Sequence, residues 1–282
     1  MGLADLLLRP VRSPVVTSAY PSSRDLPDRG HRGTPSPGSV PGASEWDAAG
    51  ACPVAAITTS DRPGSMRALA IDYGKCLFCG NCVQACPAGE LRSGNEFELA
   101  GRTRESVKTA WSLARDGAFE PPAATGDAPD HAATRGLRRS LHIRHLDSGS
   151  CNGCDWEMTA LLNPVYDIQR LGIDFVASPR HADLLLVSGA MTRNLMQAAR
   201  LTYEAMPEPR RVVAAGACAI SGGPFVDSYA TAGGADTVLP VDVFVPGCPP
   251  RPEALIHGIL LAVGRRAGGR SGDSVTVRPG RG

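Results

Sequence analysis

The second half of the chain alternates short apolar runs with segments whose apolar residues recur at helical spacing. The clearest helical segment begins at Pro252, a residue type that suits a first turn, and it places one apolar face along 255–263. Strands that alternate with helices predict βαβ units and a mostly parallel, doubly wound sheet, which is an α/β fold. The predicted strands are Leu141–Leu146, Ile173–Ala177, Ala182–Ser188, Arg211–Ala215 and Val241–Val245, and the predicted helices are Asp155–Leu162, Thr192–Ala205 and Pro252–Arg265.

The first half of the chain lacks this regular alternation. Residues 1–45 are rich in Pro, Gly, Ser and Arg, which predicts a flexible arm, or alternatively a strap around a partner subunit. Val107, Trp111 and Ala114 stand at i, i+4 and i+7 and predict a helix over 102–115, followed by a linker. The expected organisation is a flexible arm (1–45), a small cysteine-rich domain (46–100), a helix and linker (101–137), an α/β domain (138–266) and a flexible tail (267–282).

Composition narrows the possible functions. The net charge is +1 and aromatic residues make up only 5% of the chain, which disfavours a nucleic-acid partner. The apolar runs are far shorter than the roughly 18 residues of a membrane helix, so no direct membrane span is expected. Neither a secretory nor a twin-arginine signal is visible near Met1, which predicts a cytoplasmic chain whose cysteines bind metal and form no disulfides.

The first group of cysteines follows the spacing of bacterial ferredoxins. Cys76, Cys79, Cys82 and Cys86 form a C-x2-C-x2-C-x3-C-P run, and in two-cluster ferredoxins the last cysteine of each run binds the other cluster. Cys52 is followed by proline like the end of an earlier run. Counting back from it by the same spacing leads to positions that have lost their thiols, namely Gly42, Glu45 and Ala48.

We therefore expect one [4Fe–4S] cluster here, bound by Cys52, Cys76, Cys79 and Cys82, with Cys86 left without a metal. Two alternatives stay open. Cys86 could close the cluster while Cys52 is an ordinary buried cysteine, or the segment could be a zinc knuckle.

The second group is dispersed along the α/β half. Cys151 and Cys154 follow the first predicted strand, Cys218 follows a later one, and Cys248 follows the last. Because the carboxyl ends of parallel strands share one edge, this topology predicts that the four thiols meet in the crevice there. Gly149, Gly153, Gly216 and Gly247 flank them and would let the backbone approach sulfur closely. The prediction is a second [4Fe–4S] cluster, with structural zinc and a redox dithiol as alternatives.

Three motifs carry a family resemblance: Ser150–Glu157, Val212–Ala219 and Val245–Glu253. They resemble the small subunit of membrane-bound [NiFe] hydrogenases of the formate hydrogenlyase and energy-converting types, which is similar in turn to the B-type subunit of NADH–quinone oxidoreductase (complex I). The resemblance covers roughly residues 138–266 and implies a flavodoxin-like fold with a proximal [4Fe–4S] cluster. The segment 46–100 is similar to the ferredoxin subunit of such complexes, which implies a fusion of two components and a small α+β ferredoxin-like domain.

The resemblance implies an electron-transfer subunit of an oxidoreductase complex, with no complete active site on this chain. Its expected partners are a hydrogenase-like catalytic large subunit and membrane-arm subunits, which would hold it peripherally on the inner face of the cell membrane. The B-type subunit of complex I typically has adjacent cysteines where this chain has Cys151-x-x-Cys154, which favours the hydrogenase branch. The alternatives are a B-type component of a quinone-reducing complex and a zinc-stabilised assembly protein.

Overall fold

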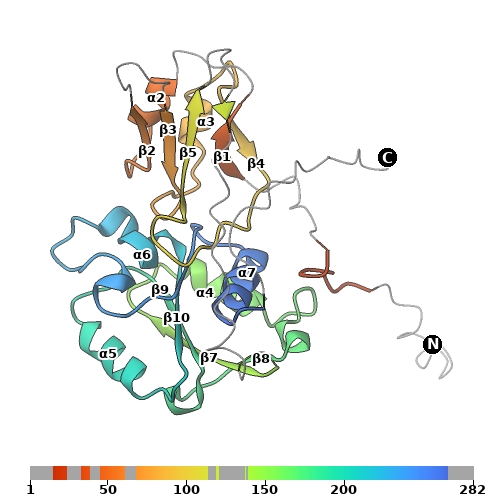
Figure 1. Ribbon diagram of the computed structural model, residues 1–282. Coiled ribbons are helices and arrows are strands. Elements are labelled where there is room, and N and C mark those ends of the chain that lie inside the picture. Colours follow the sequence, from red (N-terminus) through yellow and green to blue (C-terminus); the bar gives the residue numbers. More distant parts are fainter. Residues whose placement is uncertain are drawn as a thin grey trace, which may run out of the picture.

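The computed structural model describes residues 15–23, 33–38, 45–60, 68–113, 119–120, 137 and 139–265. These residues form two units, and Figure 1 shows the smaller, amino-terminal unit above the larger α/β unit. The expected linker, from 121 to 135, and the expected tail over 267–282 lie outside the described residues. Within the described part of the chain, no helix has the length and apolar character needed to cross a bilayer.

The α/β unit is built on a five-stranded parallel sheet with the order β11-β10-β9-β7-β8. With the strands renumbered along the chain, this order is the doubly wound 2-1-3-4-5 arrangement of flavodoxin-like folds, which confirms the predicted fold class. Each expected strand is present within a few residues of its predicted bounds. The strands are β7 (Leu141–Asp147), β8 (Ile173–Phe175), β9 (Leu184–Ser188), β10 (Arg211–Ala215) and β11 (Val243–Val245).

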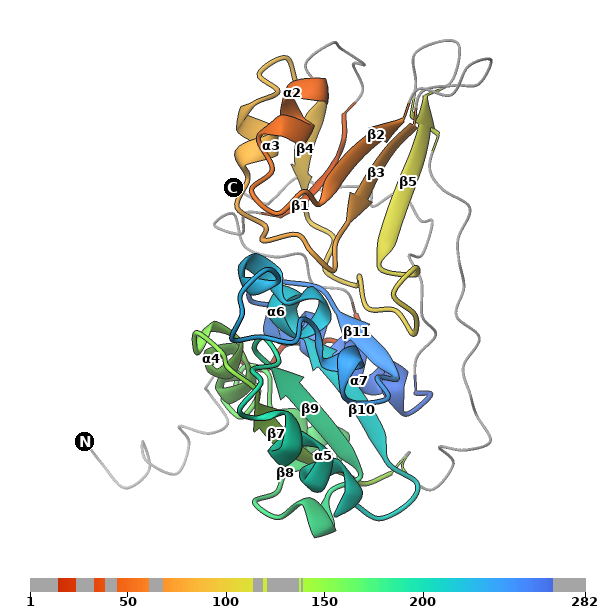
Figure 2. The ribbon, with the colours of Figure 1, turned by 90° about the vertical axis from the view of Figure 1, so that its left-hand side faces the viewer.

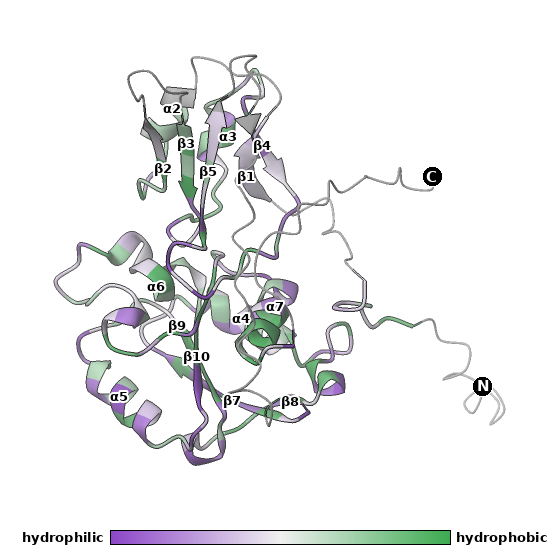
Figure 3. Ribbon diagram, viewed as in Figure 1, coloured by the Kyte–Doolittle hydropathy of each residue, from purple (hydrophilic) through white to green (hydrophobic). Residues whose placement is uncertain are grey.

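Two apolar cores lie on opposite faces of this sheet. Alternate residues of one strand enter different cores: Leu184 and Leu186 pack on one face, whereas Leu185 and Val187 pack on the other. The helices are α4 (Gly153–Ala160), α5 (Met196–Glu204), α6 (Gly216–Ser221) and α7 (Pro252–Ala262), with the short 3-10 helices η2 (Ile168–Leu171), η3 (Pro179–His181), η4 (Gly223–Phe225) and η5 (Ala235–Thr237). In Figure 3 the surface helix α5 is banded with hydrophilic and hydrophobic residues, whereas every residue of α7 is buried.

The amino-terminal unit contains two small antiparallel sheets and two short helices (Figure 2), as expected of a ferredoxin-like α+β domain. One sheet has the order β2-β3-β5-β6, and the other pairs β1 with β4. The elements are β1 (Thr34–Pro37), α2 (Glu45–Gly50), β2 (Ile57–Ser60), β3 (Ala68–Asp72), α3 (Asn81–Gln84), β4 (Leu91–Gly94), β5 (Lys108–Leu113) and β6 (Phe119–Glu120). The unit therefore extends beyond the expected 46–100 on both sides.

The predicted helix over 102–115 is wrong, because β5 occupies this segment and pairs with β3. Val107, Thr109 and Trp111 are buried, and the residues between them are exposed. This period of two is that of a strand with one buried face, and it prevails over the coincidental i, i+4 spacing of Val107 and Trp111.

Two described parts of the expected arm over 1–45 have defined structure. Thr34–Pro37 is a strand, and Tyr20 is completely buried in a core of the α/β unit. The flexible arm and the strap around a partner both stay predictions for this segment, whose described parts pack on their own chain.

A short junction joins the two units. Gly101 and Phe244 exchange both backbone hydrogen bonds, at 3.0 and 2.8 Å, so the loop between β4 and β5 of the ferredoxin-like unit pairs with the edge strand β11. The guanidinium of Arg102 donates to the carbonyl of Leu261 at 2.6 Å, at the end of α7. Arg104 forms two hydrogen bonds with Asp72, at 3.1 and 3.2 Å, which tie the junction back to the end of β3.

Candidate metal centres

The first thiol group lies where the loop after β3 enters α3. The pKa of Cys76 is raised to about 12, chiefly by burial, and the neighbouring Cys82, Cys52 and Cys79 add smaller contributions to this rise. The backbone N–H of Phe78 donates to Cys76 Sγ at 3.3 Å and opposes this rise. Burial likewise raises the pKa of Cys82 to about 11, with added repulsion from Cys52 and Cys79. The four sequence-predicted cysteines are therefore electrostatic neighbours.

Cys52 is positioned like a ligand. Its Sγ accepts a hydrogen bond from the backbone N–H of Ala56 at 3.2 Å, the kind of contact that stabilises a metal-bound thiolate. One small pocket is lined by Cys52, Cys76, Cys79 and Cys82 together. These observations favour Cys52 as the fourth member of the group.

Cys86 has a different environment. It is only 2% exposed and belongs to the apolar core of the ferredoxin-like unit, and it is absent from the pocket that the other four cysteines line. The same core contains Ala48, one of the positions inferred to have lost a thiol. Apolar packing thus occupies the region where the spacing of a two-cluster ferredoxin would have placed the lost site.

The second thiol group lies at the carboxyl edge of the parallel sheet, as the topology predicted. Cys151 follows β7, Cys154 lies in the first turn of α4, Cys218 lies in α6 directly after β10, and Cys248 follows β11. Burial raises the pKa of Cys154 far above the ordinary thiol value, and Cys218, Cys248 and Cys151 are among the groups that raise it further. Burial also raises the pKa of Cys218 to about 11, with Cys248 and Cys151 contributing. Thiolates at this site would repel one another, so the four thiols stay protonated unless a cationic partner binds.

Two glycines make the space around these sulfurs. A Cβ atom on Gly216 would lie 2.7 Å from Cys154 Sγ, and one on Gly223 would lie 2.9 Å from Cys218 Sγ. Both glycines have positive φ, +90° and +54°, which side chains rarely adopt. Gly216 was expected from its place beside a cysteine. Gly223 was missed, and the available signal was its proximity in sequence to Cys218.

Backbone strain is concentrated in the loops that carry the thiols. Of the four described non-glycine residues with positive φ, three lie there: Ala55 (48°) follows Cys52, Phe78 (52°) lies between Cys76 and Cys79, and Asn152 (66°) lies between Cys151 and Cys154. Such conformations persist where surrounding structure requires them, and they occur most often at functional sites. The residues with strained backbone conformations therefore lie in the same loops that bring the thiols together.

The donor set and its surroundings fit iron–sulfur clusters. Each group supplies four thiols, the number that a [4Fe–4S] cluster takes, and the glycines and the pocket leave room between them. Within the described residues, no three His, Cys, Asp or Glu side chains converge closely enough to hold a single ion. A cubane cluster presents a separate iron to each thiolate, so its ligands surround a volume instead of converging on one point.

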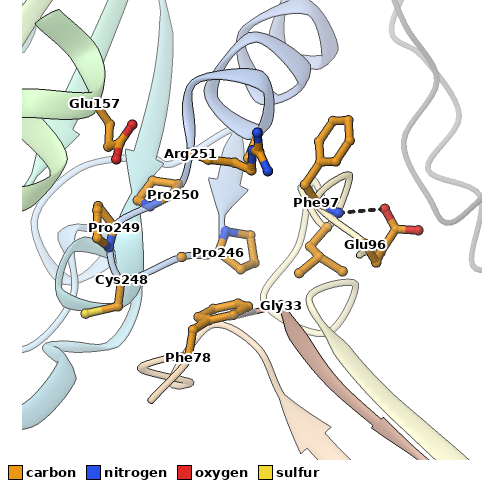
Figure 4. Close-up of a pocket in the computed structure, with 13 residues that line it drawn as sticks. Gly33, Phe78, Glu96, Phe97, Glu157, Pro246, Cys248, Pro249, Pro250 and Arg251 are labelled. Carbon is orange, nitrogen blue, oxygen red and sulfur yellow. Dashed lines mark hydrogen bonds between the residues drawn. The ribbon is translucent and has the colours of Figure 1, made fainter. Parts of the chain in front are cut away.

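The two thiol groups face each other across the boundary between the units. Cys79 of the first group raises the pKa of Cys248 of the second, after the larger effects of burial and Cys151. A pocket of about 230 Å³ lies at this boundary, and Figure 4 shows Cys248 and Phe78 on its wall. Phe78 lines this pocket and also the pocket of the first thiol group, and its ring stacks on Tyr73 with centroids 6.3 Å apart. Phe78 is thus the side chain that the two sites share, a role that sequence alone did not reveal.

Charged groups line the α/β side of the same pocket. Arg251 follows the Cys248 loop and binds Glu253 through two hydrogen bonds of 2.7 and 2.8 Å. Its guanidinium also lies 5.7 Å from the ring centroid of Phe97, which belongs to the junction. Burial raises the pKa of Glu157, and Arg251 partly offsets this. Of these charged groups, Arg251 and Glu157 line the pocket together with Cys248.

Two family models match this chain, one in each unit. Residues 151–262 match the family described as "NADH ubiquinone oxidoreductase, 20 Kd subunit", and residues 49–90 match the "4Fe-4S dicluster domain". Among solved structures, a chain of an archaeal membrane-bound sulfane sulfur reductase is 36% identical, with a TM-score of 0.41, over 49% of this chain and 80% of that one.

Three curated relatives each match less than half of this chain. The probable membrane-bound hydrogenase subunit mbhJ of Pyrococcus furiosus is 51% identical over 131 residues, 46% of this chain and 78% of that protein. Formate hydrogenlyase subunit 7 of Escherichia coli is 45% identical over 128 residues, 45% of this chain and 50% of that protein. The B-type subunit of NADH-quinone oxidoreductase from Clostridium beijerinckii is 57% identical over 108 residues, 38% of this chain and 64% of that protein.

An α/β unit with this strand order and a thiol group at its carboxyl edge defines an iron–sulfur subunit of the type found in oxidoreductase complexes. The chain belongs to the NADH–quinone oxidoreductase 20 kDa subunit family, and it carries a 4Fe–4S dicluster-type domain ahead of the family's own domain.

Proposed function

We propose that this chain is the electron-transfer subunit of a hydrogenase-like oxidoreductase complex and holds two [4Fe–4S] clusters. Cys52, Cys76, Cys79 and Cys82 would hold one cluster, and Cys151, Cys154, Cys218 and Cys248 the other. The observation that carries the proposal is the position of Phe78, which lines both the pocket of the first thiol group and the pocket that contains Cys248 of the second. When bound, such clusters accept and release single electrons.

The chain's own residues prepare both sites. Burial disfavours free thiolates and raises the pKa values of Cys76, Cys82 and Cys218, so these thiols would lose their protons only when a cationic partner binds. The backbone N–H groups of Ala56 and Phe78 donate to sulfur and stabilise its negative charge. Phe78 also covers the first group on its side toward the second, which limits the access of water.

The substrate chemistry belongs to a partner in this proposal. The curated relatives include a formate hydrogenlyase subunit and a membrane-bound hydrogenase subunit, which supports a catalytic large subunit and membrane-arm subunits as partners. Such partners would place the chain at the cytoplasmic face of the cell membrane, held peripherally.

Anaerobic purification of the full chain tests the cluster content. The expected result is a brown protein with about eight irons and about eight acid-labile sulfides per chain, and with signals from two interacting centres in electron paramagnetic resonance after reduction. A colourless protein with zinc bound by four thiolates and no acid-labile sulfide would contradict the proposal and favour a zinc-stabilised assembly protein.

A quinone-linked complex is a second candidate, favoured by the 57% identity to a NADH-quinone oxidoreductase subunit. The partner large subunit distinguishes the two branches. A co-purifying large subunit that contains nickel, and two C-x2-C pairs near its ends, would support the hydrogenase branch. A large subunit without nickel and without these pairs would favour the quinone-linked branch.

A further inference from the structure

The segment 17–20, here called the clamp, lies far from the thiols in sequence and binds the α/β unit through its backbone. The backbone N–H of Ser18 donates to the carbonyl of Val165 at 2.7 Å, and Thr17 Oγ1 donates to the carbonyl of Pro164 at 2.9 Å. Both acceptors belong to the loop that follows α4, the helix that carries Cys154. The clamp therefore holds the far end of a cluster-bearing element.

A basic side chain of the α/β unit closes over the clamp. Arg170 in η2 donates from Nη2 to the carbonyl of Ser18 at 2.8 Å, and also to the carbonyl of Tyr20. Charge-assisted bonds from one guanidinium to two nearby carbonyl acceptors fix the path of the chain as well as its position.

Tyr20 extends from the clamp into the junction between the units. Its side chain has no exposed surface, and its ring meets that of Phe97 edge to face, with centroids 5.4 Å apart and an angle of 67°. Its hydroxyl donates to Glu98 Oε1 at 2.8 Å. Phe97 and Glu98 lead from β4 to Gly101, which pairs with β11, so Tyr20 packs on the loop through which the amino-terminal unit contacts the α/β unit.

Phe97 connects the clamp to the boundary between the thiol groups. It lines the same pocket as Phe78 and Cys248 and lies beside the guanidinium of Arg251. Tyr20 packs against Phe97 and therefore helps to fix the wall of the pocket that Phe78 and Cys248 also line. The clamp and Phe97 both lie outside the segments matched by the family models, 49–90 and 151–262, so neither matched domain supplies this contact.

We infer that residues 17–20 are an intramolecular clamp that holds the junction at 97–101 against the α/β unit and so fixes Cys79 relative to Cys248. Tyr20 is a positioning residue in this arrangement. The clamp itself stands on the contacts above, whereas its consequence for the separation of two clusters rests on the proposed function.

Amide hydrogen exchange on the full chain, followed by mass spectrometry, tests the clamp without reference to activity. Tyr20→Ala should speed exchange by about tenfold or more in peptides that cover 97–101 and 164–170, because the clamp no longer packs on these segments and they open more often. Tyr20→Phe keeps the ring and removes only the donor to Glu98, so its effect should be smaller. Tyr229→Ala is the matched control, because this tyrosine is 91% exposed, and its exchange should equal that of the unmodified chain.

Exchange in Tyr20→Ala equal to that in Tyr229→Ala would overturn the clamp. If Tyr20→Ala fails to accumulate as folded protein, Arg170→Met decides instead, since it releases the carbonyls of Ser18 and Tyr20 without opening the core. Unchanged exchange at both peptides in that variant would also overturn the inference.

The magnetic interaction between the two reduced clusters tests the consequence separately. It should weaken in Tyr20→Ala and stay unchanged in Tyr229→Ala. An undiminished interaction in a variant with fast exchange would refute the role of the clamp in setting cluster separation. A single centre in the unmodified protein would instead contradict the two-cluster proposal, while the exchange data would still decide the clamp.

Discussion

Cys52 and Cys86 are the two candidates for the fourth ligand of the first cluster. Replacing each of them by alanine should have opposite effects on the iron content. Cys52→Ala removes a thiol that lines the pocket shared with Cys76, Cys79 and Cys82 and that accepts the N–H of Ala56. We expect this variant to lose the first cluster and retain the second, so that its iron falls from about eight to about four per chain.

Cys86→Ala should retain all of its iron and change only stability. The side chain is 2% exposed in an apolar core, so removing its sulfur costs the burial of about one methylene-sized group and leaves a small void. The free energy of unfolding should fall by about 1 kcal/mol. Iron, acid-labile sulfide and protein are measured on anaerobically purified samples, and unfolding is followed in urea.

The two variants are controls for each other, because each removes one sulfur from the same small unit. A Cys86→Ala protein with half the iron, beside a Cys52→Ala protein with the full amount, would refute the assignment. It would also refute the inference that Gly42, Glu45 and Ala48 mark a lost cluster.

Two further substitutions probe the α/β unit. Gly216→Ala should abolish the second cluster, because the new Cβ would lie 2.7 Å from Cys154 Sγ. Gly89→Ala is the control and should keep both clusters, because Gly89 has almost the same φ (+89°) but open space around it. Equal iron content in the two variants would show that the clash at Gly216 is tolerated. Burial lowers the pKa of His145 in the folded chain, although Asp155 opposes this. The unfolded chain therefore binds a proton at His145 more readily than the folded chain does. As a result, the free energy of unfolding should fall as the pH drops below about 6.5. His145→Gln should lose that dependence in thermal unfolding measured from about pH 5 to about pH 8, and parallel curves for the variant and the unmodified chain would contradict it.

The sheet of the α/β unit could be predicted because its strands are short, apolar runs separated by helical periods. Once the parallel order is known, Cys151, Cys218 and Cys248 must meet at one edge, since the carboxyl ends of the strands lie together. The first thiol group could be predicted from local spacing alone. In both cases the informative signal lies within a few residues of each thiol.

The remainder depends on contacts that sequence patterns do not carry. The sequence predicts a helix where β5 lies, because Val107 and Trp111 fit both a period of two and a period near four, and only pairing with β3 decides between them. Tyr20 is one aromatic residue in a segment rich in proline and serine, so composition predicted no burial, yet a core formed by distant residues receives it. Phe78 likewise gains its place between the sites only when the two units meet.

The pairing of Gly101 with Phe244 also bears on how the two halves can be separated. The strand β11 is the last of the parallel sheet, and an open strand edge is a template for unwanted association with other chains. Here the outward backbone groups of Phe244, the central residue of β11, are both used by Gly101. The fused ferredoxin-like unit therefore shields its neighbour from self-association, and an α/β unit expressed from residue 138 onward would expose this edge and aggregate.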